Sequence, residues 1–373
     1  MNQSLCSRLF GHLISDIRYR RSPPGSMFKK LRKAALILTL FGLAIGGAGA
    51  WLMFRPNTPL YEGTRSVKIP TGSSFEAVLD SLDGGLLDSR RTFAWMARLT
   101  GWGSQIKAGH YAFESGRSNY DLLNTLRKGL QTPIRLTIPP GSRAEVVAAV
   151  AGRDMAFDAE AFLAALRDPA LAEDLGTDTL HLFSYMRPET YFFYWLTDAA
   201  TVVRRVKEQF ETFFTDEMRR RADRRRLTVE DVLSLAAIVE WETNVDGEKA
   251  RVAGVYINRL QQNWPLQADP TVQYAILEDE GQKRRLFNRD YKINHPYNTY
   301  LFKGLPPGPV TNPSPSSIRA VVEAEEHNYM FFVAKPGGGH TFNATLAGHI
   351  RDAASFHRYM RQQRRQQQQA DGD

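Results

Sequence analysis

The segment Thr228–Glu242, TVEDVLSLAAIVEWE, predicts a helix that lies in the core of the protein. Thr228 and Asp231 have the spacing of a capping box, in which each side chain accepts a hydrogen bond from the other residue's backbone N–H. The eight residues that follow, 232–239, are apolar except for Ser234. We therefore expect this helix to organise a helix-rich domain of the α+β class.

The predicted helix ends in Glu240, Trp241 and Glu242, which makes its end a candidate catalytic site. Burial beside an apolar run and a tryptophan raises the pKa of a carboxyl group, as a general acid that works near neutral pH requires. The alternative interpretation is that both glutamates only mark the exit of the helix into solvent. Residues two apart on a helix point to nearly opposite sides, so the two cannot form the facing carboxylate pair of an ordinary glycosidase. Glu240 continues directly from the apolar run and is the first choice.

Several elements are predicted after this helix. Lys249–Gln261 has the pattern of a second helix, and Asp269-Pro270-Thr271 has the form of a turn followed by a helix start. Residues 297–313 form a proline-rich loop without helical or strand periodicity, and long loops inside a folded domain are usually functional. Residues 329–334 predict a buried strand, and residues 337–342 a turn.

The residues before the central helix predict smaller units. Residues 157–218 have a helical pattern interrupted at Ser184–Trp195. Two turn-then-helix patterns, Gly72-x-Ser with Leu79 and Leu82 and Gly116-x-Ser with Leu123 and Leu126, suggest small strand–helix units. A strand-like segment before Gly72 recurs in form before Gly141. Such spacing is similar to that of LysM-like carbohydrate-binding modules, although coincidental turn-then-helix patterns would look the same.

An uncharged stretch of 21 residues, 34–54, predicts a membrane-spanning helix. At about 1.5 Å per residue, its length matches the ~30 Å hydrocarbon core of a bilayer. A buried core helix and a cleaved signal peptide are the alternatives, but Arg55-Pro56 follows where a signal peptide would have a small-residue cleavage site. Four lysines and arginines crowd residues 29–33, so the positive-inside rule places residues 1–33 in the cytoplasm and residues 56–373 outside. Met27 begins a segment typical of such anchors, and residues 1–26 are interpreted as an upstream-start extension.

The charge distribution and the cysteine content exclude several classes of protein. The chain carries a net charge of +8, but residues 1–33 alone carry +7, which leaves +1 for the remainder. A nucleic-acid-binding role is therefore not expected. Cys6 is the only cysteine, so a disulfide framework is not expected, and no metal-binding or nucleotide-binding motif is present. His340 and His349 are weak ligand candidates, and we expect neither a metal nor a cofactor.

Five blocks together resemble one family: IVEWET (238–243), VAGVYINRL (252–260), LQADPTVQYA (266–275), YNTYLFKGLPPGPVTNP (297–313) and FFVAKPGGGHTFNATLAGH (331–349). In order and spacing they are similar to the endolytic murein transglycosylase family (MltG, YceG-like), and residues 107–129 resemble its LysM-like module. The resemblance covers roughly residues 60–355 and the anchor. The sequence departs from the family pattern at Pro140, at Phe183-Ser184, and at Ser314, where the family usually has glycine.

The resemblance implies that Glu240 is the catalytic acid and that a set of matching motif residues surrounds a sugar cleft. That set is Glu242, Asn258, Gln267, Asp269, Thr271, Tyr274, Tyr297, Asn298 and Tyr300. It also implies a domain order, which we expect to be a basic cytoplasmic tail (1–33), a transmembrane helix (34–54), a LysM-like α/β module (60–138), a helix-rich α+β catalytic domain (139–360) and a disordered tail (361–373).

The implied reaction is the non-hydrolytic cleavage of the MurNAc–GlcNAc β-1,4 bond of nascent peptidoglycan, which leaves 1,6-anhydro-MurNAc ends and limits strand elongation. The implied location is the inner membrane, with the catalytic domain in the periplasm and cell-wall synthases as partners. Two alternatives remain open. One is a lysozyme-type muramidase with Asp269 as second carboxylate, and the other is a non-catalytic glycan-binding scaffold for synthases.

Overall fold

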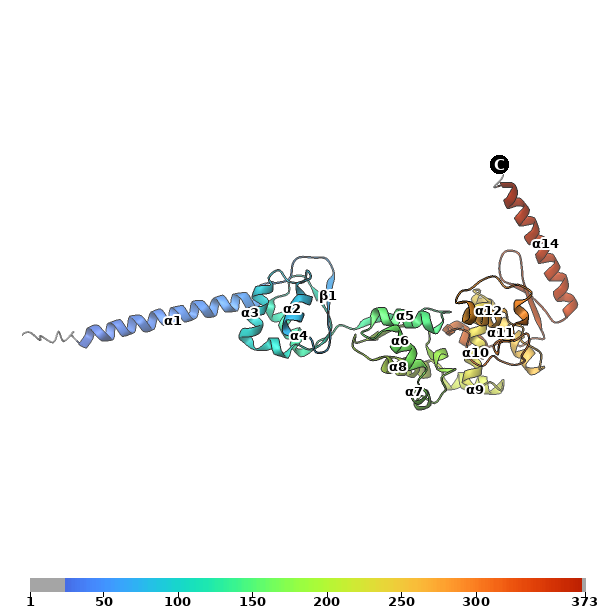
Figure 1. Ribbon diagram of the computed structural model, residues 1–373, viewed down its shortest axis with the longest axis horizontal. Helices are drawn as coiled ribbons and strands as arrows, with labels where there is room; N and C mark the ends of the chain where they lie inside the picture. Colours follow the sequence, from blue (N-terminus) through green and yellow to red (C-terminus); the bar gives the residue numbers. More distant parts are fainter. Residues whose placement is uncertain (1–23, 371–373) are drawn as a thin grey trace, which may run out of the picture. The chain divides into compact units, whose positions relative to one another are not determined.

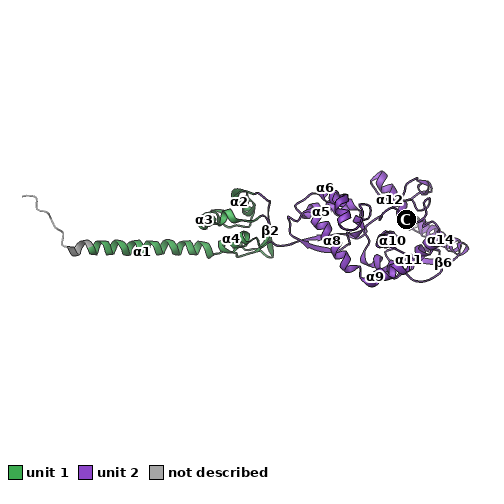
Figure 2. Cartoon of the chain, turned by 90° about the horizontal axis from the view of Figure 1, so that it is seen from below, with its two compact units in different colours: residues 1–67, 73–107, 111–130 green, residues 68–72, 108–110, 131–373 purple. Residues whose placement is uncertain are grey.

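The computed structural model describes residues 24–370 and divides the chain into two compact units (Figure 2). Unit 1 contains residues up to 67, residues 73–107 and residues 111–130; unit 2 contains residues 68–72, 108–110 and 131 onward. The predicted cytoplasmic tail as far as residue 23, including Cys6, lies outside the described residues, and so do residues 371–373.

Helix α1, Pro24–Phe54, is the long helix at the N-terminal end of unit 1 (Figure 1). Its part Phe28–Phe54 is long and apolar enough to cross a membrane, and large apolar side chains such as Leu38 and Phe41 are exposed along it. In water such exposure is unfavourable, whereas a bilayer would cover these side chains. The structure therefore contains one candidate membrane-spanning helix within residues 24–370, at the position that the sequence predicts.

Residues 56–130 form a small mixture of helices and strands; they belong to unit 1 except for residues 68–72 and 108–110, which belong to unit 2. The elements are β1 (Thr64–Ile69), α2 (Phe75–Asp83), α3 (Arg90–Thr100), a 3₁₀ helix (Trp102–Gln105), β2 (Gly109–Glu114) and α4 (Asn119–Lys128). Strands β1 and β2 form a two-stranded sheet. The predicted helix starts are confirmed, because Ser74 caps α2 and Ser118 caps α4 through a capping box.

Unit 2 begins with a helical layer around a second two-stranded sheet (Figure 1). Its elements are β3 (Ile134–Thr137), α5 (Ala144–Asp154), α6 (Ala159–Leu166), α7 (Pro169–Asp174), a 3₁₀ helix (Leu182–Tyr185), β4 (Thr190–Phe193), α8 (Ala199–Phe213) and α9 (Asp216–Arg224). Strands β3 and β4 pair antiparallel, with Ile134 opposite Phe193. Strand β4 accounts for the predicted interruption of the helical pattern, whereas β3 lies within the range expected for the small module.

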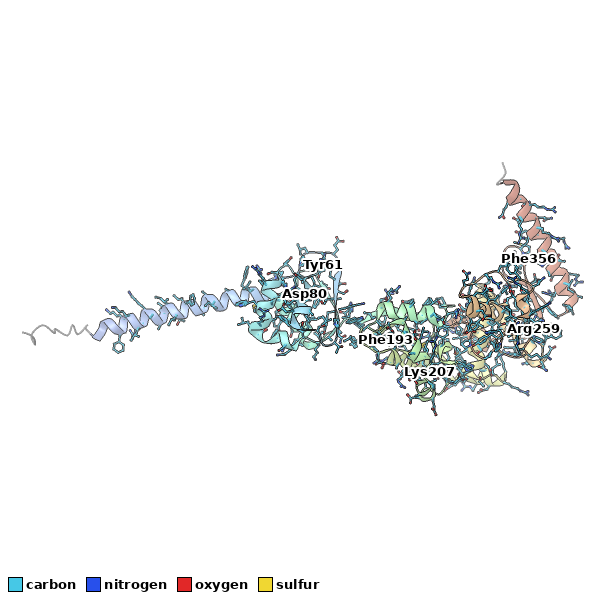
Figure 3. The ribbon with its side chains drawn as sticks, viewed as in Figure 1. Tyr61, Asp80, Phe193, Lys207, Arg259 and Phe356 are labelled. Carbon is cyan, nitrogen blue, oxygen red and sulfur yellow. The ribbon has the colours of Figure 1, made fainter. Side chains whose placement is uncertain are left out.

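The second part of unit 2 surrounds the central helix. Its elements are α10 (Val229–Glu242), α11 (Asp246–Gln261), α12 (Asp269–Glu280), a 3₁₀ helix (Asp290–Lys292), α13 (Pro315–Val322), β5 (Phe331–Ala334), β6 (His340–Asn343) and α14 (Leu346–Ala370). All eight residues 232–239 of α10 are buried, and its capping box is present. Arg259 of α11 (Figure 3) is buried and donates to the carbonyls of Met330 and Leu266, which ties strand β5 to the central helices.

Three predictions about the C-terminal region need correction. Residues 340–342, predicted as part of a turn, belong to strand β6. Strand β5 is half-buried rather than buried, because it pairs only with β6 in a two-stranded sheet, with Phe331 opposite Asn343. Residues 361–370, predicted to belong to a disordered tail, continue helix α14. Glutamine, arginine and alanine have good helix propensity, and no glycine or proline interrupts this run before residue 371, so low complexity did not prevent a helix.

Asn312 joins three chain segments that lie far apart in the sequence, and it is fully buried. Its Oδ1 accepts a hydrogen bond from the Ser142 backbone N–H (2.8 Å), and its Nδ2 donates to the carbonyls of Pro139 and Met186 (3.0 Å each). The adjacent Gly141 has φ +61°, a left-handed conformation that glycine adopts without strain. These contacts fix the loop between β3 and α5 against the proline-rich loop, and both loops border the end of α10.

Candidate active site

Glu240 lies at the C-terminal end of α10, opposite the start of α13. Its Oε2 accepts hydrogen bonds from the Ser314 N–H (3.1 Å), the Ser314 hydroxyl (2.5 Å) and the Ser317 hydroxyl (2.5 Å). Ser314 is the N-cap of α13, so its N–H lies at the helix end that favours negative charge. Within the described residues, the hydrogen bonds to this carboxyl group all end on Oε2, which leaves Oε1 for another partner.

Lys249 of α11 supplies a positive charge beside Glu240. Its Nζ lies 3.7 Å from Glu240 Oε2, and both side chains are largely buried, with exposed fractions of 7% and 12%. The same Nζ donates to Ser316 Oγ (2.9 Å) and pairs with Asp246 (3.0 Å). Lys249 and the two serines therefore stabilise negative charge on Glu240 from one side.

Trp241 connects this carboxylate to the loop between β3 and α5. Its Nε1 donates to the Gly141 carbonyl (3.0 Å), and the Lys283 Nζ lies 3.4 Å from the centre of one of its rings. A side chain held by a hydrogen bond at one edge and by a cation on its face has little freedom to rotate. The tryptophan next to Glu240 is therefore fixed in orientation.

Glu242 has partners different from those of Glu240. Its Oε1 accepts a hydrogen bond from the hydroxyl of Tyr256 on α11 (2.5 Å). Burial raises the pKa of this carboxyl group to about 7, and the nearby negative charge of Asp269 acts in the same direction, while the Tyr256 hydrogen bond and Arg259 oppose the shift. The raised pKa thus belongs to Glu242, whereas the sequence analysis chose Glu240 as the catalytic acid.

A single cleft of about 730 Å³ has Glu240, Trp241, Glu242 and Asp269 in its walls. The other lining residues come from α12, from the segment after it and from the turn after α10: Asn244, Pro270, Gln273, Lys283, Arg284, Arg285, Leu286 and Tyr291. The two glutamates thus border the same space although they bind opposite neighbours, Glu240 to α13 and Glu242 to α11. Because α10 ends inside the cleft, side chains on different sides of its last turn can contact different helices and still border the same space.

Asp269 and Tyr300 are brought together with the glutamates. The Tyr300 hydroxyl donates to Asp269 Oδ1 (2.7 Å), and the Tyr291 hydroxyl lies 3.4 Å from Oδ2. Asp269 is exposed to the cleft, and its predicted position at the start of helix α12 is confirmed. The cleft therefore contains a carboxylate that is held by two phenols.

The other expected cleft residues lie elsewhere. Tyr274 and Tyr297 stack with ring centres 4.3 Å apart and line a separate pocket of about 280 Å³ that also contains Arg143 and Phe183. Gln267 is exposed, and its backbone N–H binds the Thr299 carbonyl (3.1 Å).

Three of the expected residues bind the protein backbone. Asn258 donates to the carbonyls of His327 (2.8 Å) and Tyr329 (2.9 Å). The Thr271 hydroxyl donates to the Ala268 carbonyl (2.7 Å), and Asn298 donates to the carbonyls of Tyr291 and Ile293. The contacts of Thr271 and Asn298 hold segments that border the cleft, whereas Asn258 and its partner His327 line a different pocket.

Sequence reasoning missed Ser317, Lys249 and Lys283, and it noted Ser314 only as a departure from a family pattern. The run Ser314-Pro-Ser-Ser317 is a helix start with proline at the first helical position, and this signal predicts an exposed cap. It does not reveal that the same hydroxyl reaches Glu240, 74 residues earlier in the chain. Ser314 thus adds a hydroxyl at the carboxylate where glycine would have none.

Comparison with known proteins identifies the family. The YceG-like family matches residues 67–355 of this chain. An endolytic murein transglycosylase of Bacillus subtilis is 27% identical over 329 residues, which cover 82% of this chain and 89% of the relative. An endolytic murein transglycosylase of Streptococcus pneumoniae is 28% identical over 351 residues, which cover 84% of this chain but 63% of the relative.

The crystal structure of a yceG-like protein from Listeria monocytogenes has the same fold. It superposes with a TM-score of 0.53 at 24% sequence identity and covers 78% of this chain and 99% of its own. The helix-rich α+β architecture is thus shared with a solved structure. The chain belongs to the YceG-like family.

Glu242→Gln tests the raised pKa of Glu242. A carboxyl group whose pKa rises from 4.5 to about 7 on folding stays protonated in the folded state over a range where the unfolded chain has lost the proton. Its contribution to stability is therefore lost as the pH rises from about 4.5 to about 7, by roughly 2–3 kcal/mol. We expect the unfolding free energy of the variant, relative to the wild type, to increase by that amount between pH 5 and pH 8.

Chemical denaturation of both proteins at pH 5, 6, 7 and 8 measures this difference. Glu173→Gln, at an exposed position on α7, is the matched control and should show no such trend. A difference between the Glu242 variant and the wild type that stays constant with pH would show that Glu242 is ionised throughout this range.

Proposed function

We propose that this chain is an endolytic lytic transglycosylase that cleaves the MurNAc–GlcNAc β-1,4 bond of peptidoglycan glycan strands. The observation that carries the proposal is the Glu240 carboxyl group, which borders a cleft and is bound through one oxygen to Ser314, Ser317 and Lys249. The proposal is supported by membership of the YceG-like family and by relatives named endolytic murein transglycosylase.

In the first step, protonated Glu240 donates its proton to the glycosidic oxygen. Because Oε2 is occupied by the serines, Oε1 is the oxygen that carries this proton to the substrate. The bond to C1 breaks as positive charge develops on the sugar ring. The ammonium group of Lys249 and the serine hydroxyls stabilise the carboxylate that remains, so the protein does not have to rearrange when charge appears.

In the second step, the carboxylate of Glu240 takes the proton of the MurNAc 6-hydroxyl. The 6-oxygen then closes onto C1, which forms the 1,6-anhydro product and returns Glu240 to its protonated form. Because the substrate supplies its own nucleophile, one group serves first as acid and then as base. Trp241, fixed by Gly141 and Lys283, provides a flat apolar surface against which the sugar can be held for this closure.

The other two carboxyl groups of the cleft have positioning roles in this proposal. Glu242, with a pKa of about 7 and a hydrogen bond from Tyr256, can donate to or accept from sugar hydroxyls without carrying a full charge. Asp269, held by Tyr300, accepts hydrogen bonds from the substrate. Thr271 and Asn298 act indirectly, since they hold the segments that carry Asp269 and Tyr291. Asn258 holds the segment before β5, away from these groups.

Product analysis separates this reaction from hydrolysis. The full-length protein in detergent, incubated with polymerised, uncrosslinked glycan strands, should release fragments that end in 1,6-anhydro-MurNAc. Mass spectrometry distinguishes these ends from reducing MurNAc ends, which are heavier by one water molecule. Reducing ends would instead support a lysozyme-type muramidase in which Asp269, in the same cleft, acts as second carboxylate.

The proposal includes a location. Helix α1 anchors the chain in the inner membrane with residues 1–33 in the cytoplasm and the catalytic unit in the periplasm, because the basic residues cluster before the apolar stretch. There the enzyme would cut nascent strands beside the cell-wall synthases, its proposed partners, and so limit strand elongation. The small unit after the anchor is proposed to bind glycan as a LysM-like module does. A non-catalytic scaffold is the alternative, which the Glu240 variant discussed below tests.

A further inference from the structure

Lys283 lies in the wall of the cleft that contains Glu240, and it has no acidic partner among the described residues. Its Nζ contacts the face of Trp241, the residue after Glu240, at 3.4 Å from a ring centre. Among residues 24–370, the ion pairs within 4 Å do not include one from a carboxylate to Lys283. Burial against the tryptophan lowers the pKa of this ammonium group, and no acidic group opposes the shift.

The two cations that follow Lys283 in the cleft wall differ in their partners. Arg284 also lines the cleft, but its guanidinium is bound by Glu280 (2.7 Å) and Asp290 (2.7 Å). Arg285 lines the cleft and, like Lys283, has no ion pair within the described part of the chain. The cleft wall beside Trp241 therefore presents two cations, one of them in contact with the aromatic face, to the molecule that occupies the cleft.

We propose that Lys283, supported by Arg285, forms a subsite for a carboxylate of the substrate. This inference rests on the proposed function, because a glycan strand of peptidoglycan is the ligand. Such strands carry carboxylates of two kinds: the lactyl group of a muramic acid whose stem peptide has been removed, and the free carboxyl groups of an intact stem peptide. A charge-assisted hydrogen bond from the ammonium group recognises either kind, and Trp241 orients the lysine toward the sugar next to Glu240.

Three forms of one glycan preparation test the subsite with the full-length protein. The first carries intact stem peptides, the second is stem-free with lactyl carboxylates, and the third is stem-free with its lactyl carboxyl groups converted to neutral methylamides. We expect the wild type to cleave at least one anionic form with kcat/KM about tenfold above that of the neutral form. The form that is preferred identifies the source of the carboxylate.

Lys283→Met should reduce this preference to near unity, whereas Lys283→Arg should retain most of it. Lys303→Met, at an exposed loop position that does not line the cleft, is the matched control and should keep the wild-type ratio. Binding of the same three glycans to Glu240→Gln, with and without Lys283→Met, measures recognition without turnover and should show the same loss of preference.

Equal kcat/KM of the wild type on the three glycans would overturn the subsite, and so would an unchanged preference in the Lys283→Met variant. In both cases cleavage by the wild type still supports the proposed function. Absence of cleavage by the wild type on every form would contradict the proposed function itself, and the binding measurement then decides on the subsite alone.

Discussion

Glu240→Gln is expected to lower the rate of strand cleavage by about 10³-fold or more. The amide keeps an oxygen that can accept the hydrogen bonds from Ser314 and Ser317, but it has no acidic proton for the glycosidic oxygen. The cleft keeps its shape, so glycan binding should survive. An acid–base role predicts this combination of lost turnover and retained binding. A non-catalytic scaffold would have no cleavage to lose, so the same result excludes that alternative.

Turnover is measured as release of soluble fragments from labelled glycan strands, and binding by sedimentation with insoluble peptidoglycan. Glu230→Gln is the matched control: it lies in the first turn of the same helix, where its carboxylate binds Tyr185. This control should cleave at nearly the wild-type rate. Normal cleavage by the Glu240 variant would remove Glu240 from the catalytic role.

Asn312→Ala is expected to lower the unfolding free energy of unit 2 by about 4 kcal/mol. Alanine would leave three backbone groups without their partner, the N–H of Ser142 and the carbonyls of Pro139 and Met186. Each unsatisfied buried polar group costs about 1–3 kcal/mol. Activity should fall as well, because the Gly141 carbonyl that orients Trp241 lies in the loop that Asn312 holds.

Urea denaturation followed by circular dichroism measures the unfolding free energy. Cleavage of glycan strands at urea concentrations below the unfolding transition measures the activity. Asn288→Ala, at an exposed position in the segment after α12, is the control and should change stability by less than about 0.5 kcal/mol. If both variants unfold at the same urea concentration, the connection through Asn312 does not contribute to stability.

Local sequence signals predicted much of the fold because the forces behind them are local. The capping box of Thr228 and Asp231, the apolar run of α10 and the serine caps of α2 and α4 each depend on residues within a few positions of one another. The membrane-spanning candidate near the N-terminus was equally direct, since the length and composition of the uncharged stretch 34–54 are enough to define it.

The surroundings of Glu240 could not be predicted in this way. Its hydrogen-bonding partners come from α13, 74 and 77 residues later in the chain, and no periodicity connects the two segments. The sequence around Asn258 and Asn298 also did not reveal what their side chains bind. An asparagine that binds backbone carbonyls has the same sequence signature as one that binds sugar. Resemblance to a family supplied the candidates, and the structure supplied their different environments.

The geometry of the two glutamates shows a further limit of helical reasoning. A spacing of two residues correctly implied different neighbours for Glu240 and Glu242, Ser314 for one and Tyr256 for the other. It did not reveal that the helix ends inside a cleft, where different sides of the helix meet the same space. The angular position of a residue on a helix predicts which neighbouring elements its side chain contacts. It does not predict which side chains border a cleft at the end of the helix.

The hydrogen bonds of Asn312 also determine when the surroundings of Glu240 are completed during folding. Asn312 joins residues 170 and 126 positions earlier in the chain, and Ser314 and Ser317 follow directly after it. Contacts of such long range form late, since the intervening chain must first be ordered. A chain that is still emerging from the ribosome or crossing a membrane, with residues after 310 not yet released, holds Glu240 without its serines. Under the proposed function, activity therefore begins only after nearly all of unit 2 has been synthesised.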